Sequence, residues 1–265
     1  MPSNLAPPNP WQRLRQFTSA RIALGRAGHS QPTDAVLAFG LAHAQARDAV
    51  HQPLSCEAVE AALDEAGFAS LRVHSAAADR AQYLRRPDLG RRLDEDSRER
   101  LRQAADEPCD VAFVIADGLS SQAAQRHAVP VLSLVRKRLR ERLPDWRIGP
   151  VAIAEQSRVA LGDEIGELLR ARQVVMLIGE RPGLSSPDSL GIYLTYDPHP
   201  GRTDAQRNCI SNVRPEGLSY QQAADRLAWL LRGAVALGCS GVRLKEDSGE
   251  LGRDEPAALK SPAPD

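Results

Sequence analysis

The chain has 265 residues, of which 42% are hydrophobic, and its 34 basic residues balance its 34 acidic ones. This hydrophobic content suffices for a folded core and excludes bulk disorder, and the zero net charge gives the chain as a whole no attraction to nucleic acid or to an anionic membrane. The most apolar stretch, Val174 to Ile178, is far too short to cross a bilayer. The start of the chain lacks the pattern of a secretory signal, and four scattered cysteines without a C-x-x-C motif indicate reduced thiols, so we expect a cytoplasmic protein.

Residues 1–104 are predicted to form an N-terminal arm and a helical region. After a Pro-rich lead, the arm at 11–26 carries four arginines and no acidic residue, and its basic face either lies in solvent or binds an acidic partner. Apolar residues at helical spacing predict two helices, at 33–50 and 55–66, the second with Ser55 as its N-cap. Three further elements are expected to follow: a strand at 71–74, a polar loop at 83–93 and a charged helix at 94–105.

Residues 105–245 alternate apolar, β-rich runs with helical patterns, which is typical of an α/β domain. Because several strands are apolar without interruption, we expect them to be buried on both faces of a mainly parallel, doubly wound sheet. The tail at 246–265, rich in Pro, Ala and acidic residues, is expected to be flexible. The predicted strands are 111–116, 148–154, 174–178, 190–196 and 242–244, and the predicted helices are 131–143, 163–172 and 219–237.

Common catalytic and nucleotide-binding motifs are absent from the sequence. There is no G-x-G of a dinucleotide fingerprint, no Walker A loop, no H-E-x-x-H and no nucleophile elbow. The segment 197–201, Asp-Pro-His-Pro-Gly, comes close to the D-x-H-x-x-G element that presents a histidine to cobalt, but its glycine is one residue early. Since Pro and Gly favour turns, we interpret the segment as a turn without a metal ligand.

Polar segments follow several predicted strands, at the edge where ligands bind in open α/β sheets. A turn beginning at Asp117 follows the first strand of the domain, and local capping alone would explain it. The third strand ends in Gly-Glu-Arg-Pro-Gly (179–183), which leaves Glu180 and Arg181 either to pair with each other or to grip a ligand. A further polar segment, 207–212, follows the strand at 190–196. Several such edges together predict a small-molecule crevice.

Six segments together resemble the small (light) subunit of ethanolamine ammonia-lyase, and the similarity runs from Trp11 to Leu244. Because several long segments recur in the family's order, this signal is more specific than a single short motif. The segments are TSARIALGRAG (18–28), YLRRPDLGRRL (83–93), VIADGLSS (114–121), RVALGDEIGELL (158–169), LIGERPGLSSPDSLGIYLTY (177–196) and RNCISNV (207–213).

The resemblance implies a Rossmann-like domain that closes over adenosylcobalamin from its nucleotide side. A large TIM-barrel subunit would hold ethanolamine and carry out the radical chemistry that gives acetaldehyde and ammonia. The family's cobalamin contacts fall here on Val159, Glu180 and Cys209. Val159 would offer an apolar wall and backbone groups, Glu180 would accept hydrogen bonds from amides or ribose hydroxyls, and Cys209 would be a small contact. Arg181 would either neutralise the phosphate or orient Glu180.

The same resemblance implies that this chain supplies no catalytic residue and no cobalt ligand, because the cofactor keeps its own dimethylbenzimidazole on cobalt. The arm at 11–26 and the basic loop at 85–92 would lie on the large subunit of the hetero-oligomer. Some family members carry an amphipathic N-terminal extension that directs them into a bacterial microcompartment. Only a short Pro-rich lead precedes Trp11 here, so cytoplasmic residence is the prediction and the microcompartment is the alternative.

Two other functions remain open from the residues alone. One is a purely structural assembly subunit of the same complex, with every cobalamin contact made by the large subunit. The other is a stand-alone α/β nucleotide-binding protein, which the missing G-x-G motif disfavours.

Overall fold

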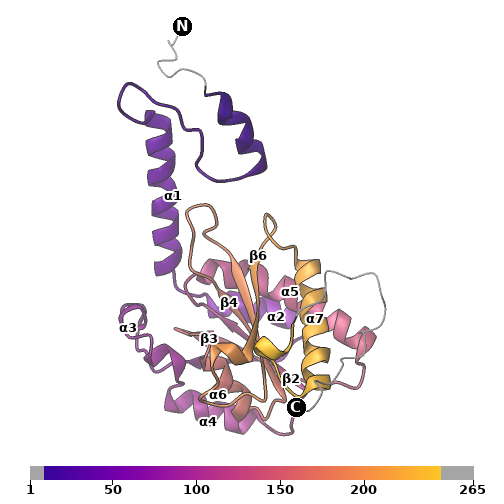
Figure 1. Ribbon diagram of the computed structural model, residues 1–265. Coiled ribbons are helices and arrows are strands. Elements are labelled where there is room, and N and C mark those ends of the chain that lie inside the picture. Colours follow the sequence, from indigo (N-terminus) through magenta and orange to yellow (C-terminus); the bar gives the residue numbers. More distant parts are fainter. Residues whose placement is uncertain (1–8, 246–265) are drawn as a thin grey trace, which may run out of the picture.

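Six strands form one sheet with helices on both faces, and an N-terminal arm extends from this body (Figure 1). The computed structural model describes residues 9–245. The strand order across the sheet is β1-β3-β2-β4-β5-β6. The strands are β1 (Ser70–His74), β2 (Val111–Ala116), β3 (Ile148–Glu155), β4 (Gln173–Gly179), β5 (Leu190–Tyr196) and β6 (Arg207–Val213).

The sheet combines a parallel half with an antiparallel half. β3 pairs in parallel with β1 and β2, and β2 pairs in parallel with β4, whereas β4, β5 and β6 form an antiparallel meander. The α/β class is therefore confirmed, but the sheet is mixed, and the Rossmann-like, doubly wound arrangement is not confirmed. The connections at 180–189 and 197–206 contain no α-helix, so each turns the chain back beside the preceding strand instead of crossing over the sheet.

Two expectations near the C-terminal end were wrong. The segment at 207–212, interpreted only as polar, belongs to strand β6. The predicted strand at 242–244 is instead a short 3-10 helix, η4 (Gly241–Arg243). Gly238 and Gly241 have φ angles of +67° and +83°, so the chain turns twice here and cannot run straight.

Most helices overlap their predicted positions, but two differ in length, and the segment predicted as a polar loop at 83–93 contains the end of α3 and a short 3-10 helix. α5 begins well before the predicted start, because the Ser120 side chain caps it by accepting a hydrogen bond from the backbone N–H of Ala123 at 3.3 Å. α6 ends before the predicted end, because Arg170 adopts a φ angle of +53°. The helices are α1 (Thr33–His51), α2 (Cys56–Glu65), α3 (Arg80–Arg85), α4 (Glu95–Ala104), α5 (Ser121–Arg142), α6 (Leu161–Leu168) and α7 (Tyr220–Leu237), with 3-10 helices η1 (Pro10–Phe17), η2 (Leu89–Arg91) and η3 (Asp204–Gln206).

Each face of the sheet has its own hydrophobic core. Phe113 and Ile115 of β2 belong to a cluster that packs under α2, α5 and α7, while Val114 and Ala116 belong to a second cluster under α4 and α6. Every residue of β2 and β4 is buried, which explains why β2 is apolar throughout and β4 is apolar after Gln173. Full burial of one large apolar side chain contributes about 1.5–3 kcal/mol, so these two strands anchor the edge that carries the polar loops.

The α6 side of strands β5 and β6 carries small and polar residues. Leu190, Ile192 and Leu194 of β5 pack into the cluster under α7, and their neighbours point to the opposite face because side chains alternate along a strand. Cys209 and Ser211 of β6 lie on that opposite face and are exposed. We define the open face as Gly191, Tyr193, Cys209 and Ser211.

One part of the N-terminal region adds a strand to the sheet, and another part extends away from it. β1 pairs with β3, so residues 1–104 contribute an edge strand as well as helices. η1 and α1 extend away from the α/β body (Figure 1). None of the helices between residues 9 and 245 is both long and apolar enough to cross a membrane. The predicted flexible tail at 246–265 lies outside the described residues.

Candidate functional site

Asp117 joins the ends of two neighbouring parallel strands. Its buried carboxylate follows β2 and accepts hydrogen bonds from the backbone N–H groups of Gly118, Gln156 and Ser157, at 2.8–2.9 Å, and from the Arg80 guanidinium at 3.1 Å. Burial raises the pKa of this carboxyl, and Arg80 and the three N–H donors oppose that shift. We call the edge of the sheet where the parallel strands have their carboxyl ends the carboxyl edge. Asp117 has a structural role there, because it fixes the loop that leads from β3 to α6.

Tyr83 fixes the polar loop at 83–93 to the same edge. Its side chain is fully buried, and its hydroxyl lies 2.9 and 3.0 Å from two backbone carbonyl oxygens that follow β2 and β3. The guanidinium groups of Arg80 and Arg158 lie over its ring, at 4.8 and 4.3 Å from the ring centroid. The loop is thereby held beside Arg158, the residue that precedes Val159 in the chain.

Glu180 follows β4, and its carboxylate reaches the open face. Its Oε1 accepts a hydrogen bond from the Ser211 hydroxyl, and its Oε2 accepts one from the Ser189 hydroxyl and a longer one, at 3.2 Å, from the backbone N–H of Asn212. Within the described part of the chain, exposed Arg181 makes no hydrogen bond or ion pair, so the Glu–Arg pair is not formed. An ionised carboxylate has about four acceptor positions, so part of the capacity of Glu180 is left for a ligand.

Cys209 lies beside Tyr193 on the open face. The two residues are direct cross-strand partners in β5 and β6, so the thiol lies next to the tyrosine. Crowding by the surrounding protein atoms, and then the charge of Glu180, raise the pKa of the Cys209 thiol; burial likewise raises the pKa of Tyr193. A thiol that stays protonated suits a binding contact better than a nucleophile.

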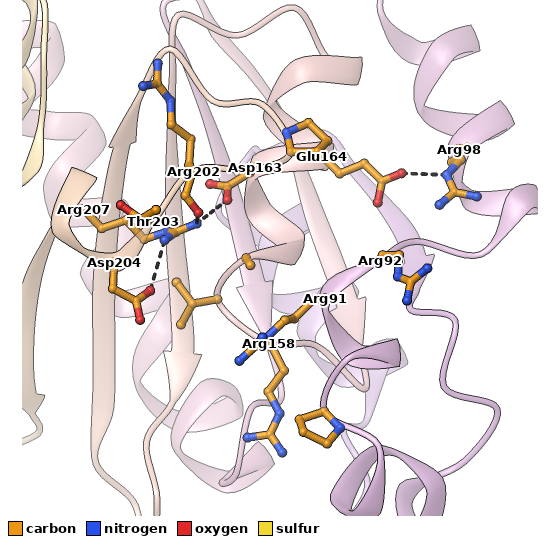
Figure 2. Close-up of a pocket in the computed structure, with 15 residues that line it drawn as sticks. Arg91, Arg92, Arg98, Arg158, Asp163, Glu164, Arg202, Thr203, Asp204 and Arg207 are labelled. Carbon is orange, nitrogen blue, oxygen red and sulfur yellow. Dashed lines mark hydrogen bonds and ion pairs between the residues drawn. The ribbon is translucent and has the colours of Figure 1, made fainter.

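Val159 lies just before α6, partly buried against the core cluster that Tyr193 also contacts. It lines a pocket of about 730 Å³ formed by the polar loop at 83–93, the start of α6 and the loop after β5 (Figure 2). Neither Glu180 nor Cys209 lines this pocket. The pocket is therefore separate from the open face, although Val159 and Tyr193 pack against the same core cluster.

Charged side chains dominate the pocket beside Val159. Arg98 pairs with Glu164 at 2.6 Å, and the buried Arg207 pairs with Asp163 and, at 3.0 Å, with Asp204. Figure 2 marks these contacts with dashed lines and shows further arginines in the same space, among them Arg91, Arg92 and Arg158. Because all three acidic residues that line the pocket have arginine partners, the remaining arginines give it a net positive charge.

The three residues predicted to contact a cofactor do not all meet in one pocket. Glu180 and Cys209 come together around Tyr193, and Val159 lies on the adjoining side near α6. The sequence reasoning missed Tyr193 and Ser211 as members of the site. One signal was available in the sequence: along 190–196, large aliphatic residues alternate with Gly191, Tyr193 and Thr195, which is typical of a strand with one less buried face.

The segment at 197–201 is a turn, as predicted. Asp197 and Gly201 have φ angles of +49° and +100°, and His199 is exposed, with its Nδ1 at 3.0 Å from the Pro200 carbonyl oxygen. Between residues 9 and 245, no three His, Cys, Asp or Glu side chains gather in an arrangement for a metal ion. All four cysteines are free thiols.

The sequence matches known proteins over nearly its whole length. The family described as "Ethanolamine ammonia-lyase light chain (EutC)" matches residues 8–245. An ethanolamine ammonia-lyase small subunit of Ralstonia nicotianae is 58% identical over 90% of this chain and 88% of its own length. A small subunit of Pseudomonas aeruginosa is 57% identical over 97% of this chain and 92% of its own length. One of Azotobacter vinelandii is 58% identical over 91% of this chain and 89% of its own length. The chain therefore belongs to the ethanolamine ammonia-lyase light-chain family, whose members are the small subunits of a lyase complex.

Proposed function

We propose that this chain holds the nucleotide side of adenosylcobalamin in an ethanolamine ammonia-lyase complex. A large TIM-barrel subunit of that hetero-oligomer binds ethanolamine and forms acetaldehyde and ammonia. The observation that carries the proposal is the open face, where exposed Cys209 and Ser211 meet the carboxylate of Glu180 at the end of a buried strand. Ligands of α/β proteins bind at such strand ends, where a few polar groups stand on an apolar support.

The residues of the open face fit the groups that cobalamin presents, namely amide side chains, a ribose and a phosphodiester. Glu180 accepts hydrogen bonds from amide N–H or ribose hydroxyl groups, Cys209 offers a small neutral contact, and Val159 offers an apolar wall with backbone groups. Adenosylcobalamin supplies the radical chemistry of the reaction when it is bound. This chain contributes position: it orients the lower half of the cofactor against the partner's substrate site.

The substitution Glu180→Ala in the co-expressed complex tests the proposal. It removes a charged hydrogen-bond acceptor, so we expect the affinity for adenosylcobalamin to fall about tenfold in equilibrium dialysis. Glu65→Ala removes an exposed carboxylate at the end of α2 and serves as the control with unchanged affinity. An unchanged affinity of the Glu180→Ala complex, with the subunits still assembled on a sizing column, would contradict the proposal.

One observation favours the purely structural alternative. Glu180 already accepts three hydrogen bonds from its own chain, so its carboxylate also ties the loop after β4 to β6. If that were its whole role, Glu180→Ala would lower the melting temperature of the complex and leave the cofactor affinity as it was. The melting temperature and the cofactor affinity of the Glu180→Ala complex therefore distinguish a residue that contacts the cofactor from one that only supports the structure.

The N-terminal arm and α1 support the large subunit as the binding partner. Trp11 and Phe17 of η1 are 66% and 79% exposed, and Leu37 and Leu41 of α1 are 67% and 61% exposed. A helix with apolar residues around most of its circumference is normally covered by protein, and an apolar patch of this kind marks an interface. The arginines of the arm favour an acidic rim on the large subunit.

We place the complex in the cytoplasm, because the four free cysteines fit a reducing compartment. Enclosure in a bacterial microcompartment is the alternative. Fractionation of cells grown on ethanolamine separates the two locations, since an enclosed enzyme sediments with the shell proteins.

A further inference from the structure

The pocket beside Val159 holds more positive charge than its own acidic residues neutralise. Six arginines and three acidic residues line it, and we call it the arginine pocket. Three of these arginines have carboxylate partners. Arg98 lies 2.6 Å from Glu164, Arg202 lies 2.6 Å from Asp197, and Arg207 pairs with Asp163. These pairs use every carboxylate that lines the pocket, because Asp163 and Asp204 both pair with Arg207.

Three arginines of the pocket are left without a full partner. Within residues 9–245, the side chain of Arg91 makes no hydrogen bond or ion pair and is exposed toward the pocket. Arg158 rests on the Tyr83 ring, and its buried Nε has no hydrogen-bond partner among the described residues. Arg92 lies 3.9 Å from Asp88, a carboxylate that Arg86 already binds at 2.7 Å.

The structure also fixes the backbone that carries Arg91 and Arg158. The backbone N–H of Arg158 donates to the carbonyl oxygen of Gly90 at 2.8 Å. This bond ties the loop that carries Arg91 to the segment that carries Val159. A Cβ on Gly90 would stand 2.9 Å from the Tyr83 ring and 3.0 Å from Arg158, so the loop approaches as closely as a glycine permits. The loop backbone and the Arg158 side chain, which lies over the Tyr83 ring, are therefore positioned beside Val159, a proposed cofactor contact.

We propose that the arginine pocket binds the phosphodiester of the cofactor's nucleotide loop, with Arg91 and Arg158 as the principal cations. The inference rests on the proposed function. Of the amides, ribose and phosphodiester that cobalamin presents, the phosphodiester is the group with a negative charge at neutral pH. Arginine forms charge-assisted, often paired, hydrogen bonds to phosphate oxygens. This assignment gives the phosphate to the pocket rather than to exposed Arg181 on the other loop.

The test compares three corrinoids on the co-expressed complex, kept in the dark. They are adenosylcobalamin, adenosylcobinamide and adenosylcobinamide phosphate. Adenosylcobinamide keeps the ring amides but lacks the nucleotide loop, and its phosphate form restores the phosphate alone. Arg91→Gln should weaken adenosylcobalamin and the phosphate form about tenfold in equilibrium dialysis and leave adenosylcobinamide binding unchanged. Raising the salt concentration should shrink the difference between wild type and variant. Arg142→Gln is the control, because Arg142 is exposed at the end of α5 and does not line the pocket.

The outcomes separate this inference from the proposed function. If Glu180→Ala weakens all three corrinoids and Arg91→Gln weakens none, cobalamin binds this chain but the phosphate lies elsewhere, and the inference is overturned. The inference is also overturned if Arg181→Gln, but neither Arg91→Gln nor Arg158→Gln, abolishes the preference for adenosylcobinamide phosphate over adenosylcobinamide. If neither Glu180→Ala nor Arg91→Gln changes the affinity for any of the three corrinoids, both the inference and the proposed function are wrong. A loss of subunit association in Arg91→Gln at unchanged corrinoid affinity makes the pocket a protein interface instead.

Discussion

At the scale of single residues, the carboxyl edge depends on groups that bond to partners far away in the chain. Asp117 is 2% exposed, and its carboxylate accepts hydrogen bonds from the end of β2, the end of β3 and α3. Arg80 extends this network, because its Nε donates to the carbonyl oxygen of Val50 at 2.7 Å near the end of α1. One carboxylate and one guanidinium thus join four segments next to the proposed cofactor site.

We expect Asp117→Asn to destabilise the chain by about 3 kcal/mol, because it removes the charge that compensates buried Arg80 and turns an amide N–H₂ toward backbone donors. The measurement is the free energy of unfolding of the full chain in urea. Asp145→Asn, at an exposed aspartate in the loop between α5 and β3, should change it by no more than about 0.5 kcal/mol. A loss equal to that of the control would mean that the Asp117 network contributes nothing to stability.

At the scale of elements, the close approach of β2 and β4 determines the shape of the edge. The backbone N–H of Leu119 donates to the carbonyl oxygen of Gly179 at 2.9 Å, and a Cβ on Gly179 would lie only 2.0 Å from the Ser120 carbonyl oxygen. Only glycine fits at that distance, so Gly179 lets Glu180 emerge directly toward the open face.

On the other side of the sheet, polar contacts also join α5 to α7. Arg138 pairs with Asp225 where both side chains are partly exposed, and buried His127 contacts Tyr220. The contact between His127 and Tyr220 predicts a pH dependence of stability. His127 of α5 is buried, its Nδ1 lies 2.6 Å from the Tyr220 hydroxyl of α7, and its Nε2 lies 3.6 Å from Asp188. Burial lowers the pKa of His127 below its ordinary value of 6.5, and Asp188 opposes the shift. As the pH falls through 6.5, the unfolded chain therefore takes up a proton before the folded chain does, and the free energy of unfolding decreases until the folded pKa is reached.

We expect His127→Gln to lose less stability than the wild type between pH 7.5 and pH 5.5 in urea unfolding. His43→Gln, at an exposed position of α1, should keep the wild-type pH dependence. The hypothesis is wrong if all three proteins lose the same free energy over that interval.

At the scale of the whole molecule, the chain has a packed α/β body and an extension that presents apolar side chains to solvent. Within α1, only Ala42 and Ala49 are buried. Arg21 of the arm donates to the carbonyl oxygen of Leu184 at 3.0 Å, so the extension touches the loop that follows Glu180. A subunit that covers α1 would therefore also stand next to the proposed cofactor site.

Leu37→Glu tests this arrangement, because it places a charge on the exposed apolar surface of α1. We expect the affinity for the large subunit to fall at least tenfold in a co-purification titration, while the circular dichroism of the isolated chain stays unchanged. Gln45→Glu adds the same charge at an exposed polar position of α1 and should have a smaller effect. Equal, full association of both variants would exclude α1 from the interface.

The sequence was informative where a feature depends on neighbours in the chain. The apolar run at 111–116, the cap at Ser55 and the stop at Gly238 predict their elements correctly, because local chemistry determines them. The antiparallel meander was missed, because the apolar strands predicted a mainly parallel sheet and 207–212 was not recognised as a strand, although the link at 180–189 is too short for a crossover with a helix. The partners of Asp117 could not be predicted, because they come from segments that only the tertiary structure brings together.

The antiparallel meander has a consequence for folding kinetics. Glu180, Tyr193 and Cys209 lie within one stretch of three neighbouring strands, whose pairing requires only short loops to close. β1, in contrast, must find β3 across the chain from Ser70 to Val151. Because contacts of small sequence separation form faster, we expect the open face to be assembled early and the outer edge of the sheet to be completed late.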